Sequence, residues 1–389
     1  MTSVQTGLDE VGGSSESERL FDATSFLDEG FDESTGSPLL GLYYALKPLL
    51  PKRAWLMARR LYAQRQSARQ FPAWPIEPLL VDRLHDRFRA ALADGAERVP
   101  FLHFWPDRKR FAVILTHDVE GSKGVENIPR VLEIERRHGM VSSWNFVAEE
   151  YPIPPDVFPS LRAAGCEIGV HGVRHDGSLF RSRASFDQQV PRIHQYMAEW
   201  DAVGFRSPST HRNASWMPEL RCSYDSSFPD TSPFEPQPGG CCSIWPYFIG
   251  ELVELPITMA QDHTMFEVLC ESTIKLWEIK SDWLIDNHGL INVLVHPDYL
   301  LSDSRLELYD QLLTRLAGRT DGWHALPRDV AAWWRARAEF QKSSPPRSAE
   351  IGGWAARATV AYARGDGEQI TFELTPADRQ IDVARASGA

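Results

Sequence analysis

A series of short apolar runs, most of them ending in polar residues, recurs through the middle of the chain. The first, FAVILTHDVE (Phe111–Glu120), is rich in β-branched residues and ends in His117, Asp118 and Glu120. This is typical of a buried parallel strand that delivers polar side chains to the rim of a sheet or barrel. The runs predict strands at Phe111–Thr116, Val141–Val147, Glu167–His171, Gly204–Arg206, Ser223–Phe228, Leu252–Ile257, Ile291–His296 and Trp323–Leu326.

Helical patterns separate most of these strands. They cover Ile128–His138, Pro155–Ala164, Phe186–Trp200, Phe266–Asn287, Arg305–Leu316 and Arg328–Phe340. Seven or eight strands with crossover helices predict an α/β fold, a (β/α) barrel, with a doubly wound open sheet as the alternative. In both architectures the site lies at the carboxyl ends of the strands. The polar residues at those ends are Asp118, His171, Arg206, Asp225 and His296.

The segments on either side of the barrel have other patterns. Residues 1–36 are rich in Ser, Gly, Asp and Glu and predict a disordered tail. Residues 37–106 show helical periodicity broken by prolines and predict a helical N-terminal extension. The barrel is expected over residues 107–340. Residues 341–389 predict a linker and a small β-hairpin around a Gly-Asp-Gly turn, which serves as a packing appendage.

Composition and charge narrow the class of protein. The 389 residues are 43% hydrophobic and 24% charged, as in an ordinary globular protein. A net charge of -12 argues against nucleic acid as a partner, because nucleic-acid binding needs clustered Lys and Arg. Five cysteines without a CxxC pair predict a reducing compartment. Since neither a secretory signal nor a transmembrane segment is evident, a cytoplasmic location is expected.

Two histidines and two acids point to a metal. His171 and His175 stand at H-x3-H spacing directly after a predicted strand, so both imidazoles can reach one cation. Two histidines with one carboxylate leave an open coordination position on zinc or a similar divalent ion, which is typical of a hydrolytic site. Asp118 and Glu120 share one face of a strand. One can bind the metal while the other acts as general base.

Further residues complete the candidate site. Arg206 can hold a catalytic carboxylate ionised, with a surface salt bridge as the alternative. His296 is suited to donate a proton to a leaving group, with a structural histidine as the alternative. Asp225 and the Asp262–His263 pair are candidates for orienting His296 or binding substrate. Aromatic side chains that can line a sugar-binding cleft are His117, Trp144, Trp216, Trp245 and Tyr247.

Taken in order, the motifs THDVE, HGVRH, RSP, YDSS and LVHPD resemble the motif series of the polysaccharide deacetylases, carbohydrate esterase family 4, with its NodB homology domain. The resemblance covers about Phe111–Phe340. It implies a distorted (β/α)7 barrel and a metal-dependent hydrolase of non-peptide carbon–nitrogen bonds. The implied reaction removes an N-acetyl, or less often an O-acetyl, group from a glycan or amino-sugar substrate.

The resemblance also implies roles for individual residues. Asp118 matches the family's base, Arg206 the arginine that braces it, and His296 the general acid. The first motif differs from the common TFDDG, because Val119 stands where a metal-binding Asp is usual. Glu120 takes the second acidic place of the family's D-x-D variant. The implied ligands are therefore Glu120, His171 and His175, holding a divalent metal that is expected to be zinc, with cobalt, nickel, manganese or iron as alternatives.

Two other functions remain open on the same residues. The protein can be a catalytically inactive glycan-binding or regulatory protein, if Glu120 fails to hold a metal. It can also be a metal-dependent amide hydrolase that acts on a small substrate other than a sugar. A cleft long enough for several sugar units would count against this last function.

Overall fold

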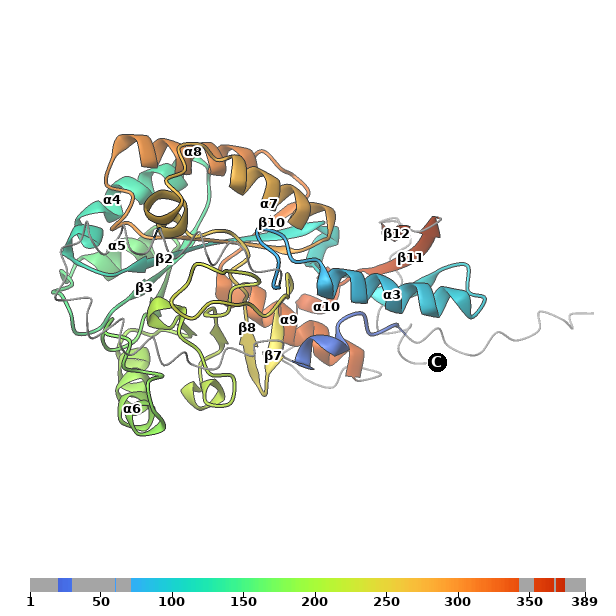
Figure 1. Cartoon of the computed structure of the whole chain (residues 1–389), viewed down its shortest axis with the longest axis horizontal. Coiled ribbons are helices and arrows are strands. Elements are labelled where there is room, and N and C mark those ends of the chain that lie inside the picture. Colours follow the sequence, from blue (N-terminus) through green and yellow to red (C-terminus); the bar gives the residue numbers. More distant parts are fainter. Residues whose placement is uncertain (1–19, 30–59, 61–70, 343–352, 367–368, 375–389) are drawn as a thin grey trace, which may run out of the picture.

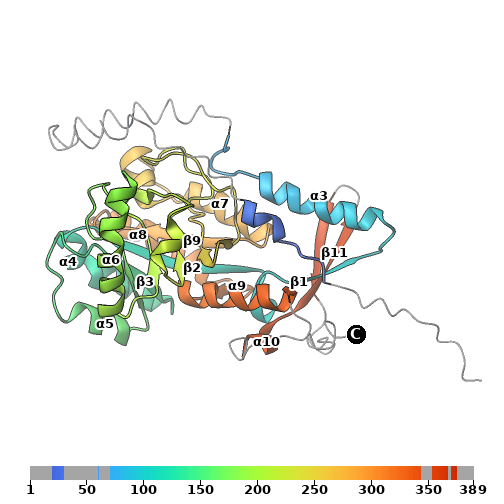
Figure 2. The same ribbon diagram turned by 90° about the horizontal axis from the view of Figure 1, so that it is seen from below.

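The computed structural model describes residues 20–29, 60, 71–342, 353–366 and 369–374 of the chain. Its centre is a curled sheet surrounded by helices (Figure 1). Beside this centre lies a smaller layer that is built from segments near both ends of the sequence (Figure 2). No helix in these described ranges combines the length and the apolar character needed to cross a lipid bilayer.

Seven parallel strands form the barrel in the described residues. The two ends of this series of strands, β8 and β9, meet through a hydrogen bond. The backbone N–H of Asn292 on β9 donates to Oγ1 of Thr258, which follows β8, at 2.9 Å. The expected distorted (β/α)7 barrel is confirmed, and the open doubly wound sheet is not. The strands are β2 (Phe111–Val119), β3 (Ser142–Phe146), β4 (Glu167–Val170), β5 (Gly204–Phe205), β6 (Tyr224–Asp225), β8 (Leu252–Glu254) and β9 (Leu290–Val295).

Two short strands extend this sheet. The strand β10 (Gly322–His324) pairs in parallel with the start of β2, as the apolar run at this position predicted. The strand β7 (Tyr247–Ile249) pairs antiparallel with β8 and was not predicted.

The helices bury one apolar face each against the barrel. Figure 1 shows α4, α7 and α8 along one side of the barrel and α6 on the opposite side. The helices are α4 (Ser122–Arg137), α5 (Val157–Ala163), α6 (Arg183–Glu199), α7 (Lys275–Asp286), α8 (Asp303–Ala317) and α9 (Pro327–Lys342).

One predicted helix is divided in the structure. The expected helix Phe266–Asn287 is instead a π-helix, η6 (His263–Val268), followed by α7. Cys270, between the two, has a φ of 60°, a left-handed conformation that does not continue a helix. The break matters for the site because η6 begins directly after Asp262.

The predicted helical extension contains a strand as well as a helix. The helix α3 (Leu79–Ala93) is followed by β1 (Val99–Leu102), which pairs antiparallel with β11 (Val360–Asp366). The latter pairs with β12 (Gln369–Leu374), so the expected C-terminal hairpin becomes a three-stranded sheet. Phe88 of α3 packs on this sheet, with ring centroids 5.0 Å from Phe101.

Residues 20–29 differ from the predicted disordered tail. They include a 3-10 helix, η1 (Ser25–Glu29), and the backbone N–H of Phe21 donates to Pro100 O at 2.8 Å. The aromatic residues that interrupt this polar segment explain the difference, because Phe26 is buried and the Phe21 ring lies 4.9 Å from that of Phe88. The remainder of the predicted tail, most of residues 37–70 and most of the linker lie outside the described residues.

Candidate metal centre

The polar residues at the end of β2 alternate between the two faces of the strand. His117 points toward the helices, where its Nε2 lies 2.5 Å from Glu135 Oε1 of α4. Asp118 points into the barrel, toward His171 and Arg206. Because successive side chains of a strand face opposite sides, only one of these two neighbours can belong to a site inside the barrel.

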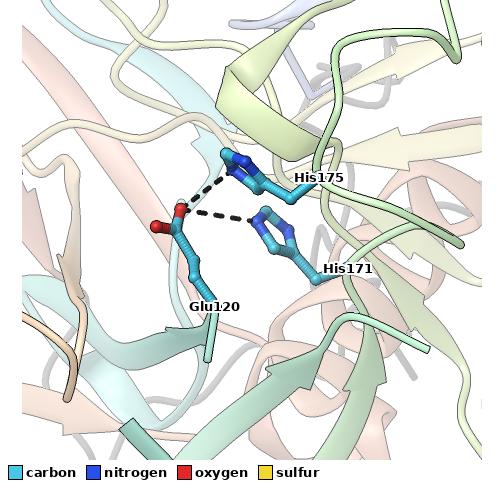
Figure 3. Close-up of side chains that lie close together, drawn as sticks. All are labelled: Glu120, His171 and His175. Carbon is cyan, nitrogen blue, oxygen red and sulfur yellow. Dashed lines mark ion pairs between the residues drawn. The ribbon is translucent and has the colours of Figure 1, made fainter. Parts of the chain in front are cut away.

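Three side chains converge on one point above the barrel. Glu120 follows β2, and His171 and His175 follow β4. One ligand atom from each lies within 4.8 Å of the others, and Figure 3 shows both imidazoles directed at the carboxylate. Glu120 Oε1 is 2.9 Å from His175 Nε2 and 4.0 Å from His171 Nε2.

The protonation of His171 suits a metal ligand. Its Nδ1 lies 3.0 Å from the carbonyl oxygen of Arg206, which can only accept, so Nδ1 carries the proton. Its Nε2 lone pair faces Glu120 and is buried without a hydrogen-bond partner in the described part of the chain. Burial lowers the pKa of His171 to about 4, which keeps the imidazole neutral. Two nitrogens and one carboxylate oxygen therefore fit zinc with an open position.

Asp298, which the sequence analysis did not identify, fixes the loop that carries Glu120. Its Oδ2 accepts from the backbone N–H of Glu120 at 2.9 Å and its Oδ1 from that of Gly124 at 3.0 Å. Gly124 is required for this approach, because a Cβ there would lie 2.0 Å from Asp298 Oδ2. The other loop is held in a similar way, since the backbone N–H of His175 donates to Glu150 Oε1 at 2.6 Å.

Asp118 lies beside these ligands but is not one of the three. Its Oδ2 is 3.8 Å from His171 Nε2, and its Oδ1 accepts from Asn145 Nδ2 at 2.9 Å. Burial by itself raises the pKa of this carboxyl, but the neighbouring histidines and Arg206 outweigh it and hold the pKa below its ordinary value. Asp118 is therefore an ionised, buried carboxylate that can accept a proton.

Arg206 is buried behind Asp118, which excludes the alternative of a surface salt bridge. Its Nε donates to Ser226 O at 2.6 Å and its Nη2 to Ser226 Oγ at 2.8 Å. These bonds leave Nη1 without a hydrogen-bond partner among the described residues, 3.8 Å from Asp118 Oδ1. The guanidinium thus presents its remaining donor to Asp118.

His296 follows β9 and is oriented by Asp262. Its Nδ1 lies 2.6 Å from Asp262 Oδ1, and its backbone N–H donates to Asp262 Oδ2 at 2.8 Å. Its Nε2 then faces the site, 4.0 Å from Asp118 Oδ2 and 3.7 Å from Glu120 Oε1. Burial by itself lowers the pKa of His296, but Asp262, together with Glu120 and Asp118, outweighs burial and raises the pKa to about 10. A cation on Glu120 would lower this value.

Among the remaining predicted site residues, His117, Trp144 and Asp225 are buried in contacts that favour a structural role. His117 and Trp144 are fully buried with ring centroids 4.1 Å apart, so neither can contact a glycan and that interpretation is wrong. Asp225 accepts from the Ser227 N–H at 3.0 Å and is buried against Glu254, which favours a structural role over orienting His296. His263 lies in η6.

Comparison with protein-family models gives no match, and comparison with curated proteins gives none either. Among solved structures, the chain is similar to a proposed polysaccharide deacetylase from Mycobacterium smegmatis, at 22% identity and a TM-score of 0.49 over 63% of this chain and 95% of that one. It is also similar to a proposed polysaccharide deacetylase from Pseudomonas aeruginosa PAO1 (16% identity, TM-score 0.48, 60% and 93% of the chains). A third is Puue allantoinase (17% identity, TM-score 0.47, 60% and 92%).

Replacement of one proposed ligand should abolish zinc binding. For His171→Ala we expect the zinc affinity to fall by more than about 100-fold. Removing a residue that hydrogen-bonds to a metal ligand usually lowers metal affinity by about 10- to 100-fold, and removing the ligand itself should lower it further. Calorimetric titration with zinc measures this, and the zinc-induced rise in melting temperature should disappear in parallel. His138→Ala, whose Nε2 lies 2.6 Å from Asp310 Oδ1 on the outer helices, is the matched control. Equal zinc affinity of His171→Ala and wild type would contradict the site.

The loop carrying Glu120 should be sensitive to a single methyl group. Gly124→Ala places a Cβ 2.0 Å from Asp298 Oδ2, so Asp298 must move and Glu120 loses its support. We expect zinc affinity to fall about 10- to 100-fold, again by calorimetry. Gly353→Ala is the control, because a Cβ there meets no atom within 4 Å. Wild-type affinity in Gly124→Ala would show that Asp298 does not position the ligand.

Proposed function

We propose that the chain belongs to the polysaccharide deacetylases and is a metal-dependent hydrolase that removes N-acetyl or O-acetyl groups from a glycan. The observation that carries the proposal is the arrangement of charges around one point. Glu120, His171 and His175 offer three ligand atoms within 4.8 Å of one another, while Asp118 and His296 approach the same point without being among the ligands. A base and an acid on either side of a metal site are what amide hydrolysis requires.

The proposed cofactor is zinc, held by Glu120, His171 and His175. A divalent cation in this place supplies Lewis acidity to an acyl carbonyl and to water. Cobalt, nickel, manganese and iron accept the same donor atoms, and the donor set by itself does not select among them.

The side chains of the chain perform the proton transfers. Asp118 accepts a proton from the attacking water at its Oδ2, the oxygen that lies 3.8 Å from His171 Nε2. Arg206 keeps this carboxylate ionised between turnovers. His296 donates the proton on its Nε2 to the departing amine, and Asp262 holds Nδ1 so that Nε2 faces the site. Since one group accepts a proton and another donates one, the two together complete the hydrolysis.

The base can be tested apart from the metal. In Asp118→Asn we expect acetate release from N-acetylated chito-oligosaccharides to fall about 10²- to 10⁴-fold, while calorimetric zinc affinity is retained. If this variant lost its zinc, Asp118 would be a ligand and its role as base would be wrong. If zinc-loaded wild type released no acetate, the deacetylase proposal would fail, and the inactive glycan-binding protein and the amide hydrolase of a small substrate would remain.

The alkaline side of the pH profile should depend on Asp262. His296 must be protonated to act as an acid, so activity is lost as the pH rises through its pKa. Asp262 raises that pKa, and Asp262→Asn should therefore move the alkaline limb of kcat/KM to lower pH and reduce kcat at neutral pH. Asp286→Asn, which removes an exposed partner of Arg110, is the control. An unchanged alkaline limb would exclude His296 as the acid that Asp262 supports.

A further inference from the structure

The turn that follows β9 carries an aromatic ring beside the proposed acid. Within this turn the backbone N–H groups of Tyr299 and Leu300 donate to His296 O at 2.9 and 3.2 Å. The rings of Tyr299 and His296 have centroids 5.2 Å apart and an interplanar angle of 76°. The main-chain hydrogen bonds thus hold the backbone of Tyr299 next to the proposed acid.

A second element supports the same ring. The His263 ring of η6 lies 5.2 Å from that of Tyr299. Arg305 of α8 joins the two elements, because its Nη1 donates to Tyr299 O at 2.9 Å and pairs with Glu267 Oε1 of η6 at 2.9 Å. The π-helix, the turn and Arg305 therefore hold Tyr299 as one unit.

Tyr299 is partly exposed, whereas most of the aromatic residues that were expected to line the cleft are buried. Trp144 and Trp245 are fully buried, and Tyr247 is nearly so. Trp216 is partly exposed but packs against Phe180, with ring centroids 6.4 Å apart. Among these aromatic side chains, only Tyr299 combines partial exposure with a ring contact to His296.

The proposed reaction places a sugar next to this ring. A proton donor must approach the departing nitrogen to about 2.6–3.2 Å, so the nitrogen lies close to His296 Nε2. In an amino sugar that nitrogen is attached directly to the pyranose ring. The pyranose must therefore lie within a few ångströms of His296, whose ring centroid is 5.2 Å from that of Tyr299.

We propose that Tyr299, supported by His263, forms the contact face for the sugar unit that carries the departing amine. The inference rests on the proposed function and extends it, since it names the subsite that binds the reacting amino sugar. A flat aromatic ring offers an apolar surface to the C–H face of a pyranose. The ring therefore contributes mainly to substrate binding, while His296 carries out the proton transfer.

Steady-state kinetics of zinc-loaded protein on N-acetylated chito-oligosaccharides test this role. We expect Tyr299→Ala to raise KM about tenfold with a much smaller change in kcat, which corresponds to about 1.4 kcal/mol of binding. Tyr299→Phe retains the ring and should keep most of the affinity. A sugar-free aryl acetate, 4-nitrophenyl acetate, is the second substrate, and its KM should respond to Tyr299→Ala far less than the KM of the glycan. Phe248→Ala on β7 is the control for loss of a partly exposed ring elsewhere.

Each alternative outcome contradicts a different part of the inference. A wild-type KM in Tyr299→Ala would show that the ring does not contact the sugar. An equal loss in Tyr299→Phe and Tyr299→Ala would assign binding to the hydroxyl and overturn the ring contact. A parallel loss on both substrates would make the ring structural. If wild type hydrolysed the aryl acetate alone, the glycan assignment would fail, and this subsite would fail with it.

Discussion

Two acidic side chains at the end of β2 must keep their negative charge inside the protein. Asp118 is buried and Glu120 is mostly buried, and an uncompensated carboxylate at such a place would take up a proton instead. The chain supplies positive charge from two later strands, by Arg206 after β5 and His296 after β9, while the neutral imidazole of His171 after β4 lies beside both acids. Because each of these groups stands at a strand end, the curl of the barrel brings the charges together.

The groups that compensate the acids are themselves held in place by residues farther away. Asp262 orients His296, Ser226 holds two arms of the Arg206 guanidinium, and Asp298 fixes the backbone before α4. These partners leave little freedom to the side chains at the centre. A site of this kind is ready for its ligand before the ligand binds, so binding does not have to order the loops.

Much of this arrangement could be read from the amino acid order, and the rest could not. The apolar runs located all seven barrel strands, and the H-x3-H spacing located His171 and His175. Asp298 was missed because its hydrogen bonds to Glu120 and Gly124 span more than 170 residues. The error at His117 was avoidable, since the period of two along β2 places it on the opposite face from Asp118. The strand β1 was missed because its partner, β11, lies near the other end of the chain.

The pairing of β1 with β11 has a consequence for how the chain can be divided. If the C-terminal hairpin were cut away, β1 would lose its hydrogen-bonding neighbour, and the aromatic face of α3 would lose the cover of Phe372. An unpaired edge strand next to exposed aromatic rings can pair with the same strand of another molecule and so promotes aggregation. A fragment that keeps α3 and β1 but lacks the hairpin is therefore a poor choice for expression, and a shortened protein is better made by keeping both flanks together.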